Sequence, residues 1–503
     1  MKLVELIAGA DAELRGEGSV EITELTYDSR EAQPGALFFC VPGMDVDGHD
    51  FAADAADRGA AALIVERYLE LPLPQVRVAG ARGAMATLAA RWFDDPTAQL
   101  TLIGVTGTNG KTTTAFLVRA ILESAGKATG LLGTVKRIVG GSEEEVVHTT
   151  PEALDLQRTF RRMLDAGDTA CVMEVSSHAL ALERTAGLDF DLAAFTNLTQ
   201  DHLDFHQGME DYFTAKRSLF ERFGPGSGSN VGPAAGPQLG PPTSVINISD
   251  AYGQRLVAEL RARPDHRLIT FSVADEDADF RARNVRFDSR GSRFSCLWAE
   301  DEVEVQIPLP GQFNVENALC ALAIADGLGA DVEAAAAALK GIDPIPGRFE
   351  PVEGGQSFLV LVDYAHTPDS LENVLVAARR LTKGRLISVF GCGGDRDREK
   401  RPLMGAIGAE HSDLAIVTSD NPRSEDPEAI IAEIVAGNHT GALEVEADRR
   451  LAIARALEAA ADGDTVLIAG KGHETGQEFE AGRKIPFDDR DVARAELRRL
   501  APT

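Results

Sequence analysis

A buried strand, a glycine-rich turn and a helix start follow one another near residue 100, and this arrangement constrains the fold more than any other feature. The apolar run 100–103 predicts a strand, and the apolar spacing over 112–124 predicts a helix. The turn between them contains Gly107 and Gly110 and ends at Lys111. Main-chain N–H groups and a helix N-terminus in such a turn point at one place, where they stabilise an anion. The segment therefore predicts a phosphate-binding loop in an α/β domain.

The loop departs from the usual pattern G-x-x-x-x-G-K-[ST] at its first glycine, where Val105 stands. Lys111 supplies a positive charge for the β- and γ-phosphates of a nucleotide, and the Thr112 hydroxyl is a Mg²⁺ ligand in loops of this kind. A glycine-rich turn with a solvated lysine is the alternative, but the flanking strand and helix favour the loop. We therefore expect the chain to bind ATP here.

Length and charge limit what the chain can be. Its 503 residues exceed what one core usually serves, so we expect two to four domains. A formal net charge of −29 argues against nucleic acid or an anionic membrane as partner. No apolar run is long enough to span a membrane, and residues 1–18 are acidic where a signal peptide is cationic. We expect a cytoplasmic monomer without membrane insertion, whose five scattered cysteines are reduced thiols.

Apolar runs and helical patterns divide the chain into three α/β segments. Residues 1–98 predict a small α/β unit. Residues 99–343 continue from the phosphate loop through further strand candidates at 170–175, 192–196 and 244–247, and predict a parallel-sheet domain of the P-loop ATPase type. Residues 344–503 alternate four apolar runs with helices, which predicts a Rossmann-like, doubly wound sheet.

Two segments read as connections. Residues 343–347 contain two prolines and a glycine and predict a hinge between the second and third domains. Residues 224–242 are rich in Gly, Pro and Ser and predict a flexible surface loop with no role in chemistry.

Polar clusters follow the predicted strands, at the ends where ligands bind in open α/β sheets. Glu174 ends one strand and is placed to hold a metal ion, although a helix-capping carboxylate is an equal alternative. Two histidines and two aspartates lie between 201 and 206, although a lone histidine is more often a structural hydrogen-bonding group. Lys216 lies near the apolar face of a predicted helix, and by itself reads as a surface lysine.

Together these segments resemble the Mur ligase family of ATP-dependent amide-bond-forming enzymes. Residues 107–112 match that family's variant of the phosphate loop, which accounts for Val105. The resemblance covers essentially the whole chain and is greatest for the family member that adds meso-diaminopimelate. It implies three substrates, namely ATP, UDP-N-acetylmuramoyl-L-alanyl-D-glutamate and the amino acid, together with two Mg²⁺ ions.

The resemblance also implies roles for matching residues. Those implied for ATP are Gly107, Thr108, Asn109, Gly110, Lys111, Thr112, Thr113, Asn247, Arg348, Asp363 and His366. Those implied for the UDP-muramoyl-dipeptide are Ser29, Thr149, Thr150, Ser176 and Arg184. Metal ligands are implied at Thr112, Glu174, His202 and Lys216, the last as a carbamate formed with CO₂, which turns a cation into an anion. The implied catalytic residues are Lys111, Glu174, His202 and Lys216.

The third domain carries the residues implied for diaminopimelate. They are Arg396, Asp420, Asn421, Pro422, Arg423, Gly470 and Glu474. Lysine-adding relatives lack the arginine at 423. Its planar guanidinium can hold the second carboxylate of diaminopimelate with two parallel hydrogen bonds, and it repels the ammonium of lysine, so that discrimination of roughly 10⁴ is within reach. Glu474 suits an ammonium group. A helix-flanking surface arginine is the alternative reading of Arg423, and Glu399 stands where the family usually has glycine.

The resemblance implies that ATP phosphorylates the γ-carboxylate of D-glutamate and that an amine of diaminopimelate attacks the acyl phosphate. Closure about 343–347 would keep water out. A sibling ligase that adds lysine or another diamine is the nearest alternative, and Arg423 speaks against it. A folate-polyglutamate ligase would not need the first domain. A P-loop switch would leave the third-domain residues without a purpose.

Overall fold

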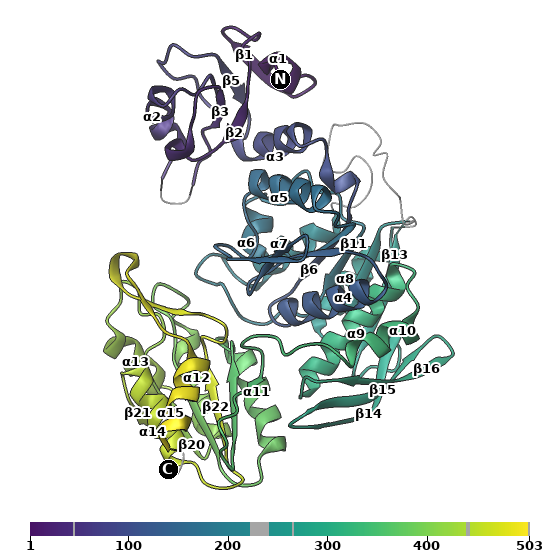
Figure 1. The fold of residues 1–503 in the computed structure, drawn as a ribbon, viewed down its shortest axis with the longest axis vertical. Helices are drawn as coiled ribbons and strands as arrows, with labels where there is room; N and C mark the ends of the chain where they lie inside the picture. Colours follow the sequence, from purple (N-terminus) through teal and green to yellow (C-terminus); the bar gives the residue numbers. More distant parts are fainter. Residues whose placement is uncertain (44–45, 222–240, 264–265, 439–442, 501–503) are drawn as a thin grey trace.

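The chain folds into three α/β domains, stacked with the N-terminal domain at one end and the C-terminal domain at the other (Figure 1). The computed structural model describes residues 1–43, 46–221, 241–263, 266–438 and 443–500. The predicted fold class is confirmed, because each domain holds a largely parallel sheet with helices packed against it. Most of the predicted flexible loop, residues 224–240, lies outside the described residues. No helix in the described ranges is long and apolar enough to cross a membrane.

The N-terminal domain is built on a five-stranded sheet with the order β1-β5-β4-β3-β2. Only β1 runs antiparallel to its neighbour. The strands are β1 (Ala12–Arg15), β2 (Glu24–Thr26), β3 (Ala36–Phe39), β4 (Ala62–Val65) and β5 (Gln75–Val78). The helices are α1 (Leu3–Leu6), α2 (Ala52–Asp57) and α3 (Ala81–Trp92), with 3₁₀ turns η1 (Ser29–Glu31) and η2 (Gly48–Phe51).

Helix α3 packs against α5 (Ala153–Asp165) of the central domain (Figure 1). Ala153 and Leu154 share an apolar cluster with Met85 of α3, so the two domains have a continuous core at this point. Shared apolar burial of this kind fixes how the first domain is presented to the second.

The central domain has an eleven-stranded sheet, with a parallel core in the order β13-β12-β11-β6-β10-β7. The core strands are β6 (Thr101–Thr106), β7 (Thr129–Leu132), β10 (Ala170–Glu174), β11 (Leu192–Phe195), β12 (Thr243–Asn247) and β13 (Arg267–Ser272). One face is covered by α4 (Lys111–Ser124), α9 (Gln312–Gly327) and α10 (Val332–Leu339). The other is covered by α5, α6 (Ser177–Ala181), α7 (Met209–Glu221) and α8 (Ala251–Leu260). Residues 100–103, 170–175, 192–196 and 244–247 were all correctly predicted as strand segments.

Further strands extend this sheet at both ends, and the sequence analysis did not predict them. They are β8 (Arg137–Val139) and β9 (Ser142–Glu144) at one end, and β14 (Phe280–Asp288), β15 (Gly291–Trp298) and β16 (Asp301–Ile307) at the other. Strand β14 joins β13 in parallel, and the other added pairings are antiparallel. In β9 and in β14 to β16, residues alternate between buried and more exposed positions or are mostly exposed. Strands with one solvated face lack the continuous apolar run by which the parallel strands were recognised.

The C-terminal domain has a six-stranded sheet with the order β17-β18-β22-β19-β20-β21. It is parallel except for the edge strand β17. The strands are β17 (Glu350–Pro351), β18 (Leu359–Asp363), β19 (Leu386–Phe390), β20 (Leu414–Val417), β21 (Leu443–Val445) and β22 (Thr465–Ala469). Helices α11 (Pro368–Leu381), α12 (Lys400–His411) and α13 (Pro427–Val435) cover one face, and α14 (Arg449–Ala459) and α15 (Asp489–Leu500) cover the other. A hairpin of β23 (Gly476–Glu478) and β24 (Lys484–Pro486) completes the domain.

Candidate active site

The phosphate loop lies between β6 and α4, as predicted. Two of its glycines are required by geometry. Gly107 has φ +149°, and a Cβ there would lie 1.9 Å from Thr196 Oγ1. Gly110 has φ +86°, and a Cβ there would lie 2.4 Å from Asn317 Oδ1. Positive φ and close approach both exclude larger residues, so the loop can keep this shape only with glycine at the two positions.

The segment after β11 holds the loop in place. Thr108 N donates to Asn197 O at 2.9 Å, and Asn109 N donates to Asn197 Oδ1 at 2.8 Å. Thr196 Oγ1 donates to Asn109 O at 2.6 Å. The segments that follow the adjacent parallel strands β6 and β11 are thus bonded to each other, and these bonds hold the phosphate loop in shape without a ligand.

Two lysine side chains converge on the same carbonyl. Lys111 Nζ donates to Gly107 O at 2.9 Å and to Thr108 O at 2.8 Å, and Lys216 Nζ of α7 donates to Gly107 O at 2.8 Å. Burial lowers the pKa of Lys111, and burial together with the Lys111 charge holds the pKa of Lys216 well below its ordinary value. Lys216 is 1% exposed, so the reading of it as a surface lysine is wrong. Carbonyl dipoles compensate a full positive charge only in part, and the Lys111 ammonium therefore favours an anion beside the loop.

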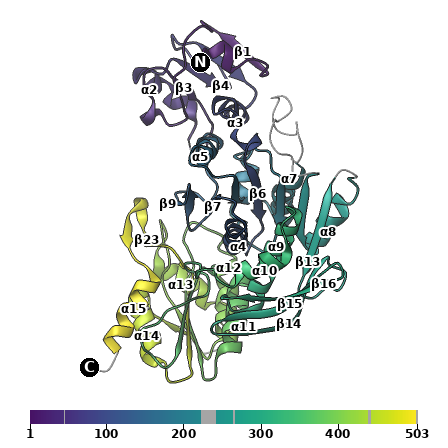
Figure 2. The ribbon, with the colours of Figure 1, turned by 45° about the vertical axis from the view of Figure 1, so that its right-hand side comes forward.

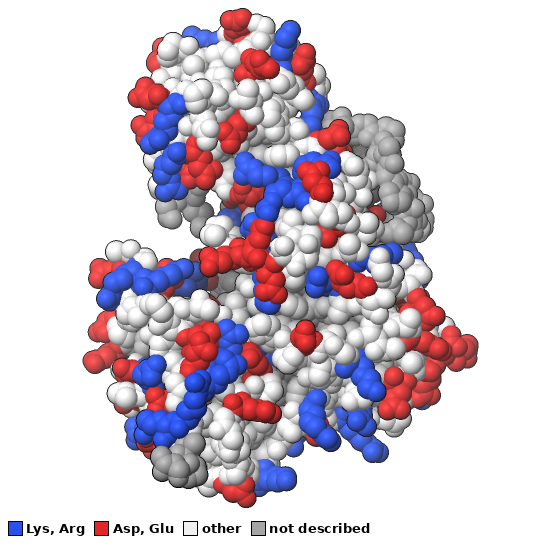
Figure 3. All heavy atoms as spheres, viewed as in Figure 1, with Lys and Arg blue, Asp and Glu red and all other residues white. Residues whose placement is uncertain are grey.

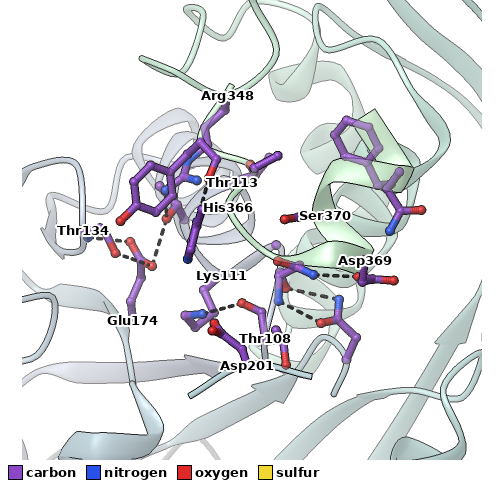
Figure 4. Close-up of a pocket in the computed structure, with 18 of the residues that line it drawn as sticks. Thr108, Lys111, Thr113, Thr134, Glu174, Asp201, Arg348, His366, Asp369 and Ser370 are labelled. Atoms are coloured by element: carbon purple, nitrogen blue, oxygen red, sulfur yellow. Dashed lines mark hydrogen bonds between the residues drawn. The ribbon is translucent and has the colours of Figure 1, made fainter. Parts of the chain in front are cut away.

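The Glu174 carboxylate stands at the end of β10, beside the start of α4 (Figure 4). Thr112 Oγ1 donates to Glu174 Oε2 at 2.9 Å. Thr134 donates to it twice, from N to Oε1 at 2.7 Å and from Oγ1 to Oε2 at 3.0 Å. The sequence analysis did not identify Thr134. The one sequence feature that points to it is its position just beyond β7, the strand beside β10. These bonds orient the carboxylate towards the phosphate loop.

His202 lies in the loop after β11 with φ +55°, its ring centroid 4.7 Å from that of His178. Burial lowers the pKa of His202 to about 3, although the Asp201 carboxylate acts to raise it. The imidazole is therefore neutral at pH 7 and keeps a lone pair for a ligand.

Thr112, Glu174, His202 and Lys216 all line one cavity. No group of three or more His, Cys, Asp or Glu side chains is arranged to hold a metal ion within the described ranges. A hydroxyl beside a carboxylate is nevertheless a fitting donor set for Mg²⁺, which keeps several waters and binds substrate phosphates through few protein ligands.

The cavity has a volume of about 830 Å³ and lies between the central and C-terminal domains. Predicted residues that line it are Thr108, Asn109, Gly110, Lys111, Thr112, Thr113, Thr149, Thr150, Glu174, Ser176, Arg184, His202, Lys216, Arg348, Asp363, His366 and Arg396.

On the face shown in Figure 3, charged side chains of both signs are interspersed, and the molecule is hollowed where the N-terminal and C-terminal domains face each other.

Several side chains cross between the central and C-terminal domains at this cavity. Arg348 Nη2 donates to Thr112 Oγ1 at 3.0 Å, and Asn109 Nδ2 donates to Asp369 Oδ2 at 2.7 Å. Asp369 lies at the start of α11. The Arg380 guanidinium of α11 stacks 5.7 Å from the Phe287 ring centroid of β14, where Figure 2 shows the two elements meeting. The phosphate loop is therefore in direct contact with the third domain.

Asp363 organises the linker that carries Arg348. It accepts hydrogen bonds from Phe349 N and Ala365 N, each at 2.7 Å. Burial nevertheless raises the pKa of Asp363 to about 6. Burial also lowers the pKa of His366, so this buried ring is neutral at pH 7.

Four of the residues predicted for the UDP-muramoyl-dipeptide line the cavity together with Glu174, namely Thr149, Thr150, Ser176 and Arg184. Thr150 Oγ1 donates to Glu174 O at 2.8 Å and accepts from Ser176 N at 3.1 Å. Glu152 pairs with Arg184 at 3.0 Å and also with Arg82 of the N-terminal domain, so one carboxylate joins two domains beside these threonines.

Among the residues predicted for ATP and the UDP-muramoyl-dipeptide, Gly107, Ser29 and Asn247 do not line the cavity. Ser29 lies in the η1 turn of the N-terminal domain. Asn247 donates from Nδ2 to Thr196 O at 2.8 Å and accepts from Ser249 N at 2.9 Å, so its amide ties β12 to the segment after β11. In the described structure its contacts are structural.

The residues predicted for diaminopimelate form a cluster at the carboxyl ends of β19, β20 and β22. Arg423 Nη1 donates to Gly394 O at 2.6 Å. Lys471 Nζ, fully buried, donates to Asn421 Oδ1 at 2.8 Å and to Glu474 Oε2 at 2.9 Å. Three loops that lie far apart in the sequence are thus bonded to one another. Of the predicted set, only Arg396 lines the large cavity.

A buried arginine forms ion pairs with the loop after β20 and with α13. Arg401 has a side chain that is 0% exposed and pairs with Glu425 at 2.7 Å and with Glu433 at 2.8 Å. Its neighbour Glu399 has φ −66° and ψ −26°, a conformation open to any residue. The glutamate therefore fits where relatives usually have glycine.

Models of one family match most of the chain. The model for the Mur ligase family, catalytic domain, matches residues 21–91; that for the Mur ligase middle domain matches 105–325; and that for the Mur ligase, glutamate ligase domain, matches 347–472. The UDP-N-acetylmuramoyl-L-alanyl-D-glutamate–2,6-diaminopimelate ligase of Syntrophomonas wolfei subsp. wolfei is 44% identical over 512 residues, covering 99% of each chain. The chain belongs to the Mur ligase family.

Further relatives agree with the Mur ligase assignment. The ligase of the same name from Solibacter usitatus is 46% identical over 482 residues, covering 95% of this chain and 94% of the relative. A solved structure of a UDP-N-acetylmuramoyl-L-alanyl-D-glutamate–2,6-diaminopimelate ligase aligns with a TM-score of 0.69 at 32% identity, over 100% of both chains. The family resemblance predicted from the motifs is confirmed.

Proposed function

We propose that this chain is an ATP-dependent ligase that joins meso-diaminopimelate to UDP-N-acetylmuramoyl-L-alanyl-D-glutamate, in the synthesis of peptidoglycan precursors. The observation that carries the proposal is the single cavity that unites the phosphate loop, Thr149 to Arg184, and Arg396 of the third domain. The full-length likeness to diaminopimelate ligases supplies the identity of the substrates. Because the reaction uses ATP and a uridine nucleotide, we place it in the cytoplasm, and we expect a monomer.

The first chemical step transfers the γ-phosphoryl group of ATP to the γ-carboxylate of D-glutamate. A carboxylate is a poor electrophile, and phosphorylation supplies a leaving group. Lys111 and the loop N–H groups are placed to neutralise negative charge on the transferring group. Arg348, which reaches the start of α4 from the third domain, adds a further positive charge. An amine of diaminopimelate then displaces phosphate and forms the amide.

The Mg²⁺ ions that the family implies fit the donor set beside the loop. Thr112, Glu174, His202 and Lys216 would hold two ions between them. Bound there, Mg²⁺ supplies electrostatic stabilisation of the phosphoryl oxygens. Thr134 keeps the Glu174 carboxylate in place through two hydrogen bonds, and the low pKa of His202 keeps its imidazole available.

Lys216 is suited to become a carbamate. Its low pKa leaves a larger fraction of the amine neutral, and a neutral amine attacks the carbon of CO₂ with loss of one proton. The product is an anion, which suits Mg²⁺ and the positive charge of Lys111 better than a second ammonium does. ¹³C NMR of protein equilibrated with ¹³CO₂ tests this, with Lys216→Arg as the variant that must lack the signal.

Arg396, Asp420, Asn421, Pro422, Arg423, Gly470 and Glu474 are proposed to bind diaminopimelate. The support is their convergence: Asn421, two residues before Arg423, donates to Glu474 at 2.9 Å, and Arg423 donates to Gly394 O. A far carboxylate on the guanidinium and an ammonium on Glu474 would satisfy both charges of the distal end. Closure of the third domain about 343–347 would exclude water, which otherwise hydrolyses the acyl phosphate.

The proposal is tested by phosphate release from ATP in the presence of the UDP-muramoyl-dipeptide, with meso-diaminopimelate, L-lysine or no amino acid. We expect turnover with diaminopimelate and a loss of at least 10²-fold in Arg423→Ala. Arg290→Ala, which removes an exposed arginine 87% accessible on β14–β15, is the matched control and should leave turnover unchanged. Preferred turnover with lysine moves the assignment to a sibling ligase. ATP hydrolysis that is indifferent to both substrates contradicts the ligase.

A further inference from the structure

The β23–β24 hairpin places a carboxylate directly on Arg423. Arg423 Nε lies 3.2 Å from Glu478 Oε2, and the two side chains are 22% and 32% exposed. Their main chains are also bonded, because Arg423 N donates to Glu478 O at 3.1 Å. The hairpin is anchored a second time, since Glu478 N donates to Asn421 Oδ1 at 3.0 Å. Glu478 is therefore a fixed neighbour of the guanidinium.

Arg423 is held in a strained but defined position. Its φ is +51°, in the left-handed region that residues with a Cβ rarely occupy. Nη1 donates to Gly394 O, and Nε donates to Glu478. A guanidinium has five N–H groups, so three remain after these two bonds. Three are enough for two parallel hydrogen bonds to a further carboxylate, and Glu478 can therefore stay in place while a substrate binds.

The charge of Glu478 then acts on both kinds of substrate. It lies closer to Arg423 than a Debye length, so salt does not remove its effect. A carboxylate that approaches Arg423 is repelled by Glu478, whereas an ammonium that approaches is attracted by it. Because Lys471 is matched in the same way by Glu474, the cluster as a whole has little excess positive charge.

We infer that Glu478 is a specificity-determining residue, which weakens the preference of Arg423 for an amino acid with a distal carboxylate. This inference rests on the proposed function. The hairpin and the arginine have opposite effects. Arg423 favours diaminopimelate over lysine, and Glu478 lowers the ratio of kcat/KM for diaminopimelate to kcat/KM for lysine. The charges of both side chains therefore contribute to how strongly the enzyme prefers diaminopimelate to lysine.

Glu478 could instead serve only to hold the arginine. The two roles predict opposite results for Glu478→Gln, which keeps the shape of the side chain and removes its charge. If Glu478 only holds Arg423, the loss of the ion pair lets the guanidinium move, and diaminopimelate is used less well. If its charge opposes the distal carboxylate, diaminopimelate is used better.

The test compares kcat/KM for meso-diaminopimelate and L-lysine at saturating ATP and UDP-muramoyl-dipeptide, in wild type, Glu478→Gln and Glu480→Gln. Where turnover of lysine is too slow, its inhibition constant against diaminopimelate replaces kcat/KM. Glu480 is an exposed glutamate of the same hairpin and is the matched control. We expect the diaminopimelate-to-lysine ratio to rise about tenfold in Glu478→Gln, mainly through a lower KM for diaminopimelate, and to stay unchanged in Glu480→Gln.

Glu478→Asp provides a second reading, because it keeps the charge but shortens the side chain by one methylene. Its ratio should fall between those of wild type and Glu478→Gln, and a far-UV spectrum and melting curve establish that each variant folds. A ratio that is unchanged or lower in Glu478→Gln, in an enzyme that still adds diaminopimelate, overturns this inference alone. Absence of diaminopimelate-dependent turnover in wild type overturns the proposed function itself.

Discussion

The phosphate-loop centre and the amino-acid loops both lie at the carboxyl ends of parallel strands, yet they treat charge in different ways. We use "phosphate-loop centre" for residues 107–113 with Lys216, and "amino-acid loops" for residues 393–397, 420–425 and 470–478. In the first, both lysines donate to main-chain carbonyls. In the second, cations are paired with carboxylates, as Lys471 is with Glu474 and Arg423 is with Glu478.

The difference matches the ligands proposed for each region. A centre in which the Lys111 charge is only partly compensated gains most from a polyanion such as ATP, because the ligand brings the missing negative charge. Loops whose charges are already balanced suit a zwitterion, which can exchange one ion pair for another without leaving a net charge. Four experiments can break or sharpen this comparison.

The largest effect is expected from removing the loop lysine. Lys111→Met keeps most of the side-chain volume and removes the charge that faces the phosphates. We expect kcat/KM for ATP to fall about 10³-fold, the scale of losing a preorganised electrostatic contact in an enclosed site. Steady-state phosphate release measures it, with the exposed Lys340→Met as control. A loss below tenfold would mean that the lysine charge is not what binds the phosphates.

The next effect concerns the stability of the amino-acid loops. Arg449 and Asp489 form a bidentate pair at 2.8 and 2.7 Å with both side chains 0% exposed, and Arg449 also donates to Ala469 O just before Gly470. Asp489→Asn leaves a buried arginine without its counter-ion and should destabilise the C-terminal domain by about 3–5 kcal/mol. Chemical unfolding measures it. Asp491→Asn, two residues along and 76% exposed, should change stability by less than about 1 kcal/mol.

A pH-dependent effect is expected at Glu316 of α9, which lines the cavity and precedes Asn317, a neighbour of Gly110 in the phosphate loop. Burial, with smaller contributions from Asp369 and Asp250, raises the pKa of Glu316 to about 7. The folded state therefore binds a proton that the unfolded state releases, and wild-type stability falls as pH rises from about 4.5 to about 7. Glu316→Gln lacks this loss.

The Glu316 prediction is checked by unfolding both proteins at pH 5 and pH 8. The two should be alike at pH 5, and the variant should be more stable by roughly 1–3 kcal/mol at pH 8. The exposed Glu304→Gln should show no such divergence. If wild type and Glu316→Gln differ equally at both pH values, the glutamate does not titrate in this range. It then carries a negative charge at pH 7, and the net positive charge near the phosphate loop is smaller than inferred.

The smallest effect tests the comparison directly. Raising the salt concentration from 50 to 500 mM shortens the Debye length from roughly 14 Å to roughly 4 Å. KM for ATP should rise about threefold, whereas KM for diaminopimelate should change by less than about twofold, because a zwitterion meets balanced charges. Equal salt dependence of the two KM values would show that the regions do not differ in net charge as their ion pairs suggest.

Contiguous motifs made much of the site predictable. The strand, glycine turn and helix around Lys111 could be recognised because the phosphate loop consists of consecutive residues with a fixed backbone shape. Glu174 and His202 could be placed near it because the carboxyl ends of parallel strands share one edge. The sequence did not reveal Thr134 or the contact of Asp369 with Asn109, since these depend on which strand or domain lies beside them. It did not predict β14 to β16, whose solvated faces interrupt the apolar pattern.

The amino-acid sequence alone determined the three-domain α/β organisation, the phosphate loop and the family, because apolar periodicity and short motifs are local properties. Only the tertiary structure decided that Lys111 and Lys216 share one carbonyl, that Asn109 contacts the third domain, and that Glu478 pairs with Arg423. These contacts join residues that lie 55 to 260 positions apart. Their strength depends on burial and distance in the folded chain, which no local pattern records.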